Sequence, residues 1–187
     1  MKGNYAIMAD DMPLPQGTTF RCLVDENSER LFRIAYRMTG NRDDADDVVQ
    51  ETFLKAYRSF DRFVPGGSES VWLNRIVSNC AIDWIRRRKH RRTEDLDRTE
   101  EYARAVSTEP APDRSLFDGQ IRARIEAELA KLSDKERTAF VLRHFDGRPI
   151  LEIAETMDAP IGSVKNNIFR AVRKLRAALQ PTLGGSR

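Results

Sequence analysis

The stretch from residue 147 to residue 176, GRPILEIAETMDAPIGSVKNNIFRAVRKLR, most constrains what this chain can fold into. Two segments with apolar residues at helical spacing meet there at a tight corner. Asp158 stands where the corner needs a residue that tolerates a positive φ, and Pro160 prevents the first helix from running on. The pattern predicts a helix-turn-helix with apolar faces formed by Ile150, Ile153, Ala154 and Met157, then by Ile161, Val164, Ile168, Val172 and Leu175.

The outer face of the second helix is polar and basic. Ser163 can cap this helix, and the positions that follow it alternate basic, amide and aromatic side chains. Such a helix fits the major groove of DNA, with its first residues on base edges and its Arg and Lys on phosphates. An ordinary helical hairpin with a solvated basic face is the alternative. The outward residues are Lys165, Asn166, Phe169, Arg170 and Arg173.

The charges are concentrated in blocks, although the net charge is only +3. Residues 84–92 hold six Arg or Lys and no acid, and residues 163–176 hold five more, again with no acid. Between them, residues 93–118 carry eight Asp or Glu against three Arg. Two basic blocks separated by an acidic spacer indicate two nucleic-acid contacts on one chain.

Every other strong periodicity in the chain is helical as well. Gly40 is placed to end a first helical region over residues 19–39, and Asn41 can cap the helix that follows. Pro65 and the two glycines after it interrupt the pattern before a third helix over residues 70–90. The expected core positions are Leu31, Ile34, Ala35 and Met38, then Val49, Phe53, Ala56 and Phe60, then Leu73, Ile76, Val77, Cys80, Ala81 and Trp84.

Helical patterns resume at residue 119 with Ile121, Ile125 and Leu129. Ser133 and Glu136 form a capping-box pattern ahead of the apolar run Ala139, Phe140, Leu142 and Phe145. The sequence therefore predicts an all-α fold, with two small helical domains joined by a flexible acidic linker.

Composition argues against several other classes of protein. Cys22 and Cys80 lie far apart and outside any CxxC motif, so neither a disulfide nor a zinc site is expected. His90 and His144 have no neighbouring ligand residues, and we expect no metal, no cofactor and no catalytic residue. Without a signal-peptide pattern or a long apolar run, we expect a cytoplasmic protein with no membrane insertion.

The segment DDADDVVQETFLKAYRSFDRF (43–63), followed by VWLNRIVSNCAIDWIRRR (71–88), resembles region 2 of a bacterial sigma factor. The segment from Leu132 to Arg176 resembles region 4. The ordered pair, in a chain this short, is similar to the extracytoplasmic-function (ECF, group IV) sigma factors of the sigma-70 family. The domains implied are a tail (1–18), region 2 (19–92), the acidic linker (93–118), region 4 (119–182) and a second tail (183–187).

The resemblance implies an alternative sigma factor that binds core RNA polymerase at its β′ clamp helices and β flap. It implies promoter DNA as the second partner and a separate anti-sigma factor as the regulator. Region 2 would melt the minus-10 element, with a base flipped into a pocket made by the loop before the third helix. The residues implied for the minus-35 element are Ser163, Lys165, Asn166, Phe169, Arg170 and Arg173. The residues implied for the minus-10 element and its melting are Phe63, Gly67, Ser68, Arg75, Asn79, Asp83, Arg86, Arg87 and Arg88. The residues implied for binding the polymerase are Asp47, Gln50, Glu51 and Leu54.

Some residues depart from the family pattern. Ser133 stands where Pro is usual, and Pro149, expected at a first helical position, stands where Ser is common. Asn166 and Asn167 replace Ser and Arg, which changes the promoter sequence expected but not the mode of binding.

Two alternative functions remain open. A free-standing helix-turn-helix regulator would leave residues 43–92 without a purpose. An enzyme acting on nucleic acid would need a cluster of acids or histidines, and the sequence offers no suitable one.

Overall fold

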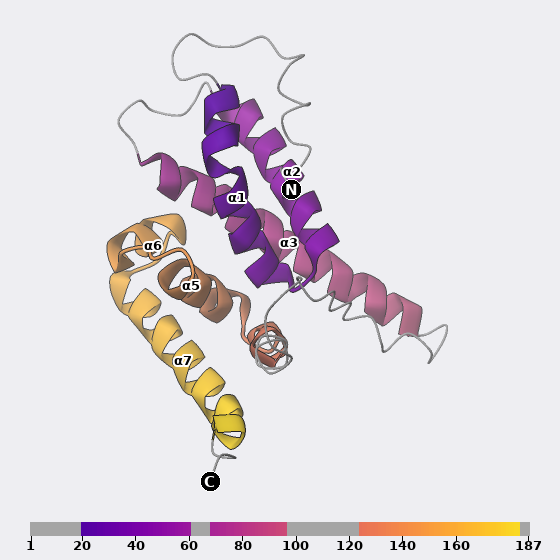
Figure 1. Ribbon diagram of the computed structural model, residues 1–187, viewed down its shortest axis with the longest axis vertical. Helices are drawn as coiled ribbons and strands as arrows, with labels where there is room; N and C mark the ends of the chain where they lie inside the picture. Colours follow the sequence, from indigo (N-terminus) through magenta and orange to yellow (C-terminus); the bar gives the residue numbers. More distant parts are fainter. Residues whose placement is uncertain (1–19, 61–67, 97–123, 184–187) are drawn as a thin grey trace.

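The computed structural model describes residues 20–60, 68–96 and 124–183, and all regular structure in these ranges is helical (Figure 1). The first half of the chain contains α1 (Phe20–Thr39), α2 (Arg42–Ser59) and α3 (Glu69–Leu96). The second half contains a helical segment over residues 124–130, then α5 (Asp134–His144), α6 (Ile150–Thr156) and α7 (Ile161–Leu183). The predicted all-α class is confirmed. Within the described ranges, no helix combines the length and the apolar character that crossing a bilayer requires.

Helices α1, α2 and α3 pack together around an apolar core. Gly40, at a φ of 73°, ends α1 as predicted, and the side chain of Asn41 accepts a 3.0 Å hydrogen bond from the backbone N–H of Asp44. This cap satisfies one of the N–H groups that a helix start leaves unpaired. All the predicted core positions of this half are buried except Phe60, Ile76 and Trp84, which are partly buried against the core.

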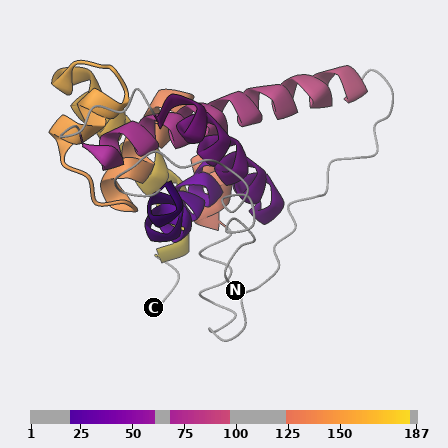
Figure 2. The same cartoon turned by 90° about the horizontal axis from the view of Figure 1, so that it is seen from above.

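The third helix is longer than its sequence pattern predicts. We expected it to end at residue 90 and the linker to begin at residue 93, whereas α3 continues to Leu96. Its C-terminal part extends beyond the helices on which α3 packs (Figures 1 and 2). Arg and Lys are good helix formers, so a basic run can prolong a helix without burying an apolar face. The rest of the predicted linker, residues 97–118, lies outside the described residues.

The helix starts of the second half follow the sequence closely. The backbone N–H of Ser133 donates to the Glu136 carboxylate (3.1 Å), and the Ser133 hydroxyl accepts from the backbone N–H of Glu136 (3.3 Å). This is the predicted capping box at the start of α5. At the corner between α6 and α7, Asp158 takes a φ of 46°, as its short polar side chain led us to expect.

Two helix starts in this half differ in detail from the expectation. The carbonyl of Pro160 accepts from the N–H groups of Ser163 (2.9 Å) and Val164 (3.1 Å), so α7 begins at Ile161 and Ser163 lies in its first turn instead of capping it. Pro149 is the N-cap of α6 and not its first residue. Because proline fixes its own φ and has no N–H, both prolines define a helix start from outside the helix.

Two apolar residues expected on inner faces are exposed. Phe145 follows the end of α5 and is 42% exposed, with the guanidinium of Arg37 4.4 Å from the centre of its ring. Ile161 opens α7 and is 44% exposed, one turn ahead of the buried Val164. Both residues stand at helix ends: Phe145 follows the last turn of α5, and Ile161 is the first residue of α7.

The two halves of the chain lie against one another: α1 packs on α5, and α3 packs on α6 (Figure 1). One continuous cluster of buried apolar side chains joins them and includes Leu142, Ile153 and Val164 of the second half. Arg137 of α5 is 6% exposed and donates to the carbonyls of Met38 (2.7 Å) and Ala130 (2.5 Å). Its cation thereby joins the C-terminal ends of two helices, where the helix dipole favours positive charge.

Candidate nucleic-acid and protein interfaces

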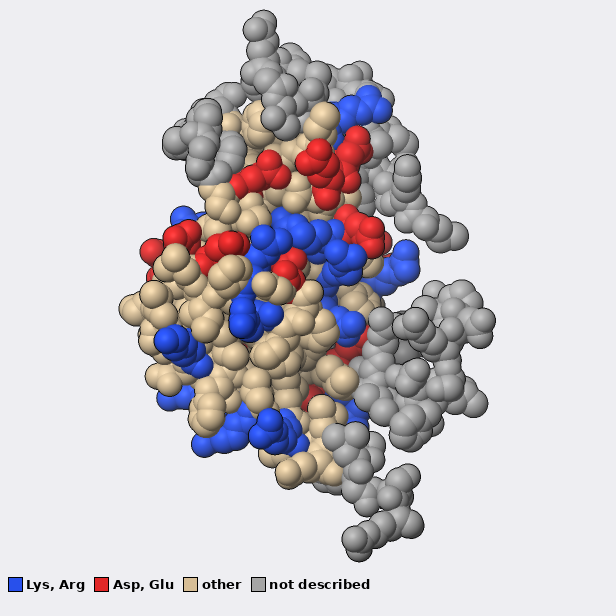
Figure 3. All heavy atoms as spheres, turned by 60° about the vertical axis from the view of Figure 1, so that its left-hand side comes forward, with Lys and Arg blue, Asp and Glu red and all other residues tan. Residues whose placement is uncertain are grey.

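The N-terminal half of α7 presents a mixed basic and polar face to solvent. Lys165, Asn166, Arg170 and Arg173 are exposed, and Phe169 is 64% exposed. Val164 and Ala171, on the opposite face, are fully buried against the rest of the second half. The orientation predicted for the recognition helix is therefore correct. In Figure 3, separate basic side chains lie among uncharged surface on the lower part of the molecule, at the height of α7, where few acidic groups lie.

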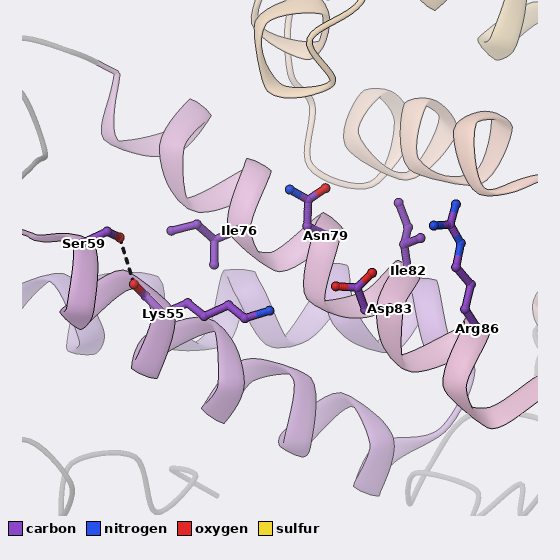
Figure 4. A pocket seen from close by; sticks show the side chains of 7 residues that line it. All are labelled: Lys55, Ser59, Ile76, Asn79, Ile82, Asp83 and Arg86. Atoms are coloured by element: carbon purple, nitrogen blue, oxygen red, sulfur yellow. Dashed lines mark hydrogen bonds between the residues drawn. The ribbon is translucent and has the colours of Figure 1, made fainter. Parts of the chain in front are cut away.

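The polar face of α3 borders a pocket of about 430 Å³. Asn79, Asp83 and Arg86, three of the residues predicted for the minus-10 element, line it together (Figure 4). The sequence reasoning did not find the other lining residues, Lys55 and Ser59 from α2 and Ile76 and Ile82 from α3. Figure 4 shows Lys55 extending along the space between α2 and α3. Phe63 and Gly67, expected to form a base pocket, lie outside the described residues, and Ser68 is exposed just before α3.

Two of the α3 arginines contact the second half of the chain. Arg75 donates to the backbone carbonyls of Glu155 and Thr156 at the C-terminal end of α6, with 3.4 Å to the oxygen of Thr156. Arg86 forms an ion pair with Asp134 in the first turn of α5 (2.9 Å). Both arginines remain accessible to solvent, so these contacts occupy the guanidinium groups without burying them.

The next two arginines pair with α2 instead. Arg87 lies 3.0 Å from a carboxylate oxygen of Glu51, and Arg88 pairs with Asp44. The other oxygen of Glu51 lies 2.9 Å from the Nζ of Lys55. Burial disfavours the charged form of Glu51, but the hydrogen bonds from Lys55 and Arg87 outweigh it and lower the pKa of this carboxyl.

The outer stripe of α2 that was predicted to bind polymerase faces away from the core. Asp47 and Gln50 are exposed, Leu54 is 38% exposed, and Glu51 is partly exposed between them. Carboxylates around an accessible leucine form a surface that suits a partner with arginines around an apolar contact.

A buried polar cluster at the contact between the two halves was not apparent from the sequence. Asp146, in the connection between α5 and α6, has a side chain only 5% exposed and lies 3.2 Å from Arg30 of α1 and 2.7 Å from Arg148. Asn74 of α3 donates to the same carboxylate (3.2 Å) and accepts from Arg30 (2.6 Å). One carboxylate thus joins three parts of the chain that are far apart in sequence.

Family models match both halves of the chain. The model for sigma-70 region 2 matches residues 23–91, which span most of α1 to α3, and the model for sigma-70 region 4 matches residues 122–175, which include the helix-turn-helix. The ECF RNA polymerase sigma factor SigW of Bacillus subtilis is 33% identical over 166 residues, 86% of this chain and 89% of that protein. This chain belongs to the ECF RNA polymerase sigma factors.

Another relative carries the same family name, and two solved structures resemble this chain. SigE of Mycolicibacterium smegmatis is 37% identical over 154 residues, which are 82% of this sigma factor but 59% of that longer protein. Among solved structures, the sigma factor RpoE of Bartonella quintana, in complex with the anti-sigma factor NepR, has a TM-score of 0.69 and 25% identity. That match covers 86% of this chain and 96% of the other. CnrH in complex with the cytosolic domain of CnrY has a TM-score of 0.64 and 26% identity, covering 95% and 96%.

Proposed function

We propose that this sigma factor binds core RNA polymerase through the α2 stripe and directs it to promoters whose two elements are read by α3 and α7. The observation that carries this proposal is the presence of three separate exposed surfaces on one chain. They are the carboxylate-edged stripe of α2 for a protein partner and the polar and basic faces of α3 and α7 for DNA. A free-standing regulator would need only the helix-turn-helix, and the carboxylate-edged stripe on α2 would then have no partner. The protein acts by binding, without catalysis of its own, and we place it in the cytoplasm with the polymerase and the DNA.

We assign the minus-35 element to α7. Asn166 can donate and accept at a base edge, Lys165 and Arg170 can bind a guanine edge or a phosphate, and Arg173 is placed for the backbone. The aromatic ring of Phe169 gives an apolar contact to a thymine methyl group or a sugar. Because the opposite face of α7 is buried, the recognition helix presents these groups on a rigid support.

We assign the minus-10 element to the polar face of α3 and the pocket beside it. Asn79 and Asp83 offer hydrogen-bond groups that suit the edge of an unstacked base, and Ile76 and Ile82 provide apolar surface next to them. Arg86, Arg87 and Arg88 continue this face as a basic run for the phosphates. Extruding a base costs a few kcal/mol, and the pocket together with the backbone contacts would offset that cost.

Full engagement of the minus-10 element requires the two halves to move apart. In the packed arrangement Arg75 is bound to the end of α6 and Arg86 to Asp134, so both must exchange these partners for phosphates. We propose that core polymerase, through its β′ clamp helices and β flap, holds the halves separated at promoter spacing. The Bartonella quintana sigma factor, solved with an anti-sigma factor, supports an anti-sigma factor as a further partner of this chain.

Reconstitution with core polymerase tests the proposal. Wild-type protein should support transcription from a subset of a promoter library, and the double variant Asp47→Asn, Leu54→Ala should lose polymerase binding while keeping its helical circular dichroism. Asp43→Asn, which removes an exposed charge near the start of the same helix, is the matched control and should retain binding. If the double variant bound polymerase as well as the control did, the stripe would not be the polymerase surface.

A further inference from the structure

The carboxylate of Glu51 contacts two cations that belong to different surfaces. One oxygen lies 2.9 Å from the Nζ of Lys55, which lines the pocket beside Asn79 and Asp83. The other lies 3.0 Å from Arg87 in the basic run of α3. Glu51 itself belongs to the α2 stripe, and its side chain is 29% exposed, so an incoming partner can reach it.

We infer that Glu51 is a positioning residue that couples the polymerase surface to the DNA surface, an inference that rests on the proposed function of both. In the free protein its single charge is shared between Lys55 and Arg87 and reduces the positive potential that both offer to DNA. A cation from the polymerase that pairs with Glu51 competes for the same two oxygens. Lys55 then becomes available to a base or phosphate at the pocket, and Arg87 to the DNA backbone.

The coupling follows from the single negative charge of one carboxylate, which a third cation would have to share with Lys55 and Arg87. An arginine binds a carboxylate through two parallel hydrogen bonds and uses both oxygens, the two atoms that Lys55 and Arg87 occupy here. Any interaction that competes in this way is reciprocal, so bound DNA must also favour polymerase binding by the same factor. Exposed ion pairs are individually weak, so the expected factor is modest, roughly two- to fivefold.

Asp44 repeats part of this arrangement two turns earlier on the same face of α2. It lies seven positions before Glu51 on α2 and pairs with Arg88, the residue that follows Arg87. Asp47, between the two, is exposed and makes no ion pair with the described part of the chain. The helix therefore offers a matched pair of substitutions: Glu51→Gln and Asp47→Asn each remove one negative charge from the stripe, but only the first releases cations of the DNA surface.

The test measures the affinity of the free full-length protein for a fluorescein-labelled single-stranded DNA of 20 nucleotides and mixed sequence, by anisotropy at low salt. We expect Glu51→Gln to tighten binding roughly two- to fivefold over wild type, and Asp47→Asn to change it much less. In a background with Lys55→Ala and Arg87→Ala, the gain from Glu51→Gln should disappear. Equal gains from the two single variants, or a gain that persists in that background, would show that only net charge matters and would overturn the inference.

Failure of this inference is distinguishable from failure of the proposed function. The DNA measurement contains no polymerase, so it tests only the link from Glu51 to Lys55 and Arg87. Whether the stripe binds polymerase is decided by Asp47→Asn, Leu54→Ala in a separate assay. A third measurement tests the link between the polymerase surface and the DNA surface. With saturating core polymerase, the difference in DNA affinity between wild type and Glu51→Gln should shrink toward zero. An undiminished difference would overturn the coupling.

Discussion

The carboxylate of Asp146 lies 3.2 Å from the guanidinium of Arg30, across the contact between two halves that the sequence separates by more than a hundred residues. Both side chains are largely removed from solvent, at 5% and 15% exposure. Asn74 and Arg148 complete the hydrogen bonds of this carboxylate, so the charge is paired as well as buried. A buried charge that loses its partner is costly, and this makes the contact sensitive to single substitutions.

Asp146→Ala should therefore favour separation of the two halves. Removing one partner of a buried ion pair costs about 3–5 kcal/mol in the packed state, whereas Arg30 regains water once the halves are apart. Small-angle X-ray scattering should report a larger radius of gyration for the variant. Glu29→Ala, which breaks the exposed ion pair with Arg33 on the same helix, is the control and should leave the radius unchanged. An unchanged radius for Asp146→Ala would contradict the role given to this carboxylate.

Glu136 should make stability depend on pH. Burial disfavours its charged form, but Lys174, at 2.7 Å, and the hydrogen bonds with Ser133 outweigh this and lower its pKa below the ordinary value of 4.5. A carboxyl with a lowered pKa in the folded state stabilises that state above its unfolded pKa and loses this contribution as the pH falls through the folded pKa.

Urea titrations between pH 6 and about pH 3 measure this contribution. Wild type should lose stability as the pH falls below 4.5, and Glu136→Gln should show a flatter dependence because it has no proton to gain. Glu128→Gln, which removes a carboxylate paired with the exposed Lys131, is the control and should follow wild type more closely. A Glu136→Gln profile parallel to that of wild type would exclude Glu136 as a source of the pH dependence.

Much of each half could be predicted from the sequence because its signals are local. Gly40, Asn41, the capping box at Ser133 and the positive φ of Asp158 each depend on a few neighbouring residues. The exposure of Asn166 and Phe169 follows from helical periodicity in the same way. Where two local signals compete, the sequence alone does not decide between them. Pro160 and Ser163 could each define the start of α7, and the helix begins directly after Pro160.

The contact between the halves could not be predicted, because nothing local encodes it. In the sequence, Asp146 has the features of an ordinary turn residue, and Arg30 has those of a solvated position on an amphipathic helix. Their contact forms only when the chain folds. The pocket could not be predicted for the same reason, since Lys55 of α2 comes close to Asn79 and Asp83 of α3 only when the two helices pack. Periodicity identifies which face of a helix points outward, and tertiary packing decides what that face meets.

Asn79→Ala should impair promoter opening without changing selectivity at the minus-35 element. Its side chain lines the pocket in which we place an unstacked base, so losing its hydrogen bonds to the base edge should weaken the melted state by roughly 1–3 kcal/mol. Transcription from a duplex template should fall about tenfold or more, and a template with a pre-melted bubble should restore part of it. Equal losses on duplex and bubble templates would show that Asn79 does not contribute to opening.

Substitutions on α7 should alter the choice of promoter. A side chain that reads a base edge is worth about 1–3 kcal/mol of discrimination, so Asn166→Ala or Arg170→Ala should lower promoter use roughly ten- to a hundredfold and relax one or two minus-35 positions. Arg176→Ala, an exposed change further along the same helix, is the control and should weaken all promoters alike, if at all. Transcription from templates with single-base changes in each element is the measurement. If the Asn166 variant lost selectivity at the minus-10 element instead, the assignment of α7 to the minus-35 element would be wrong.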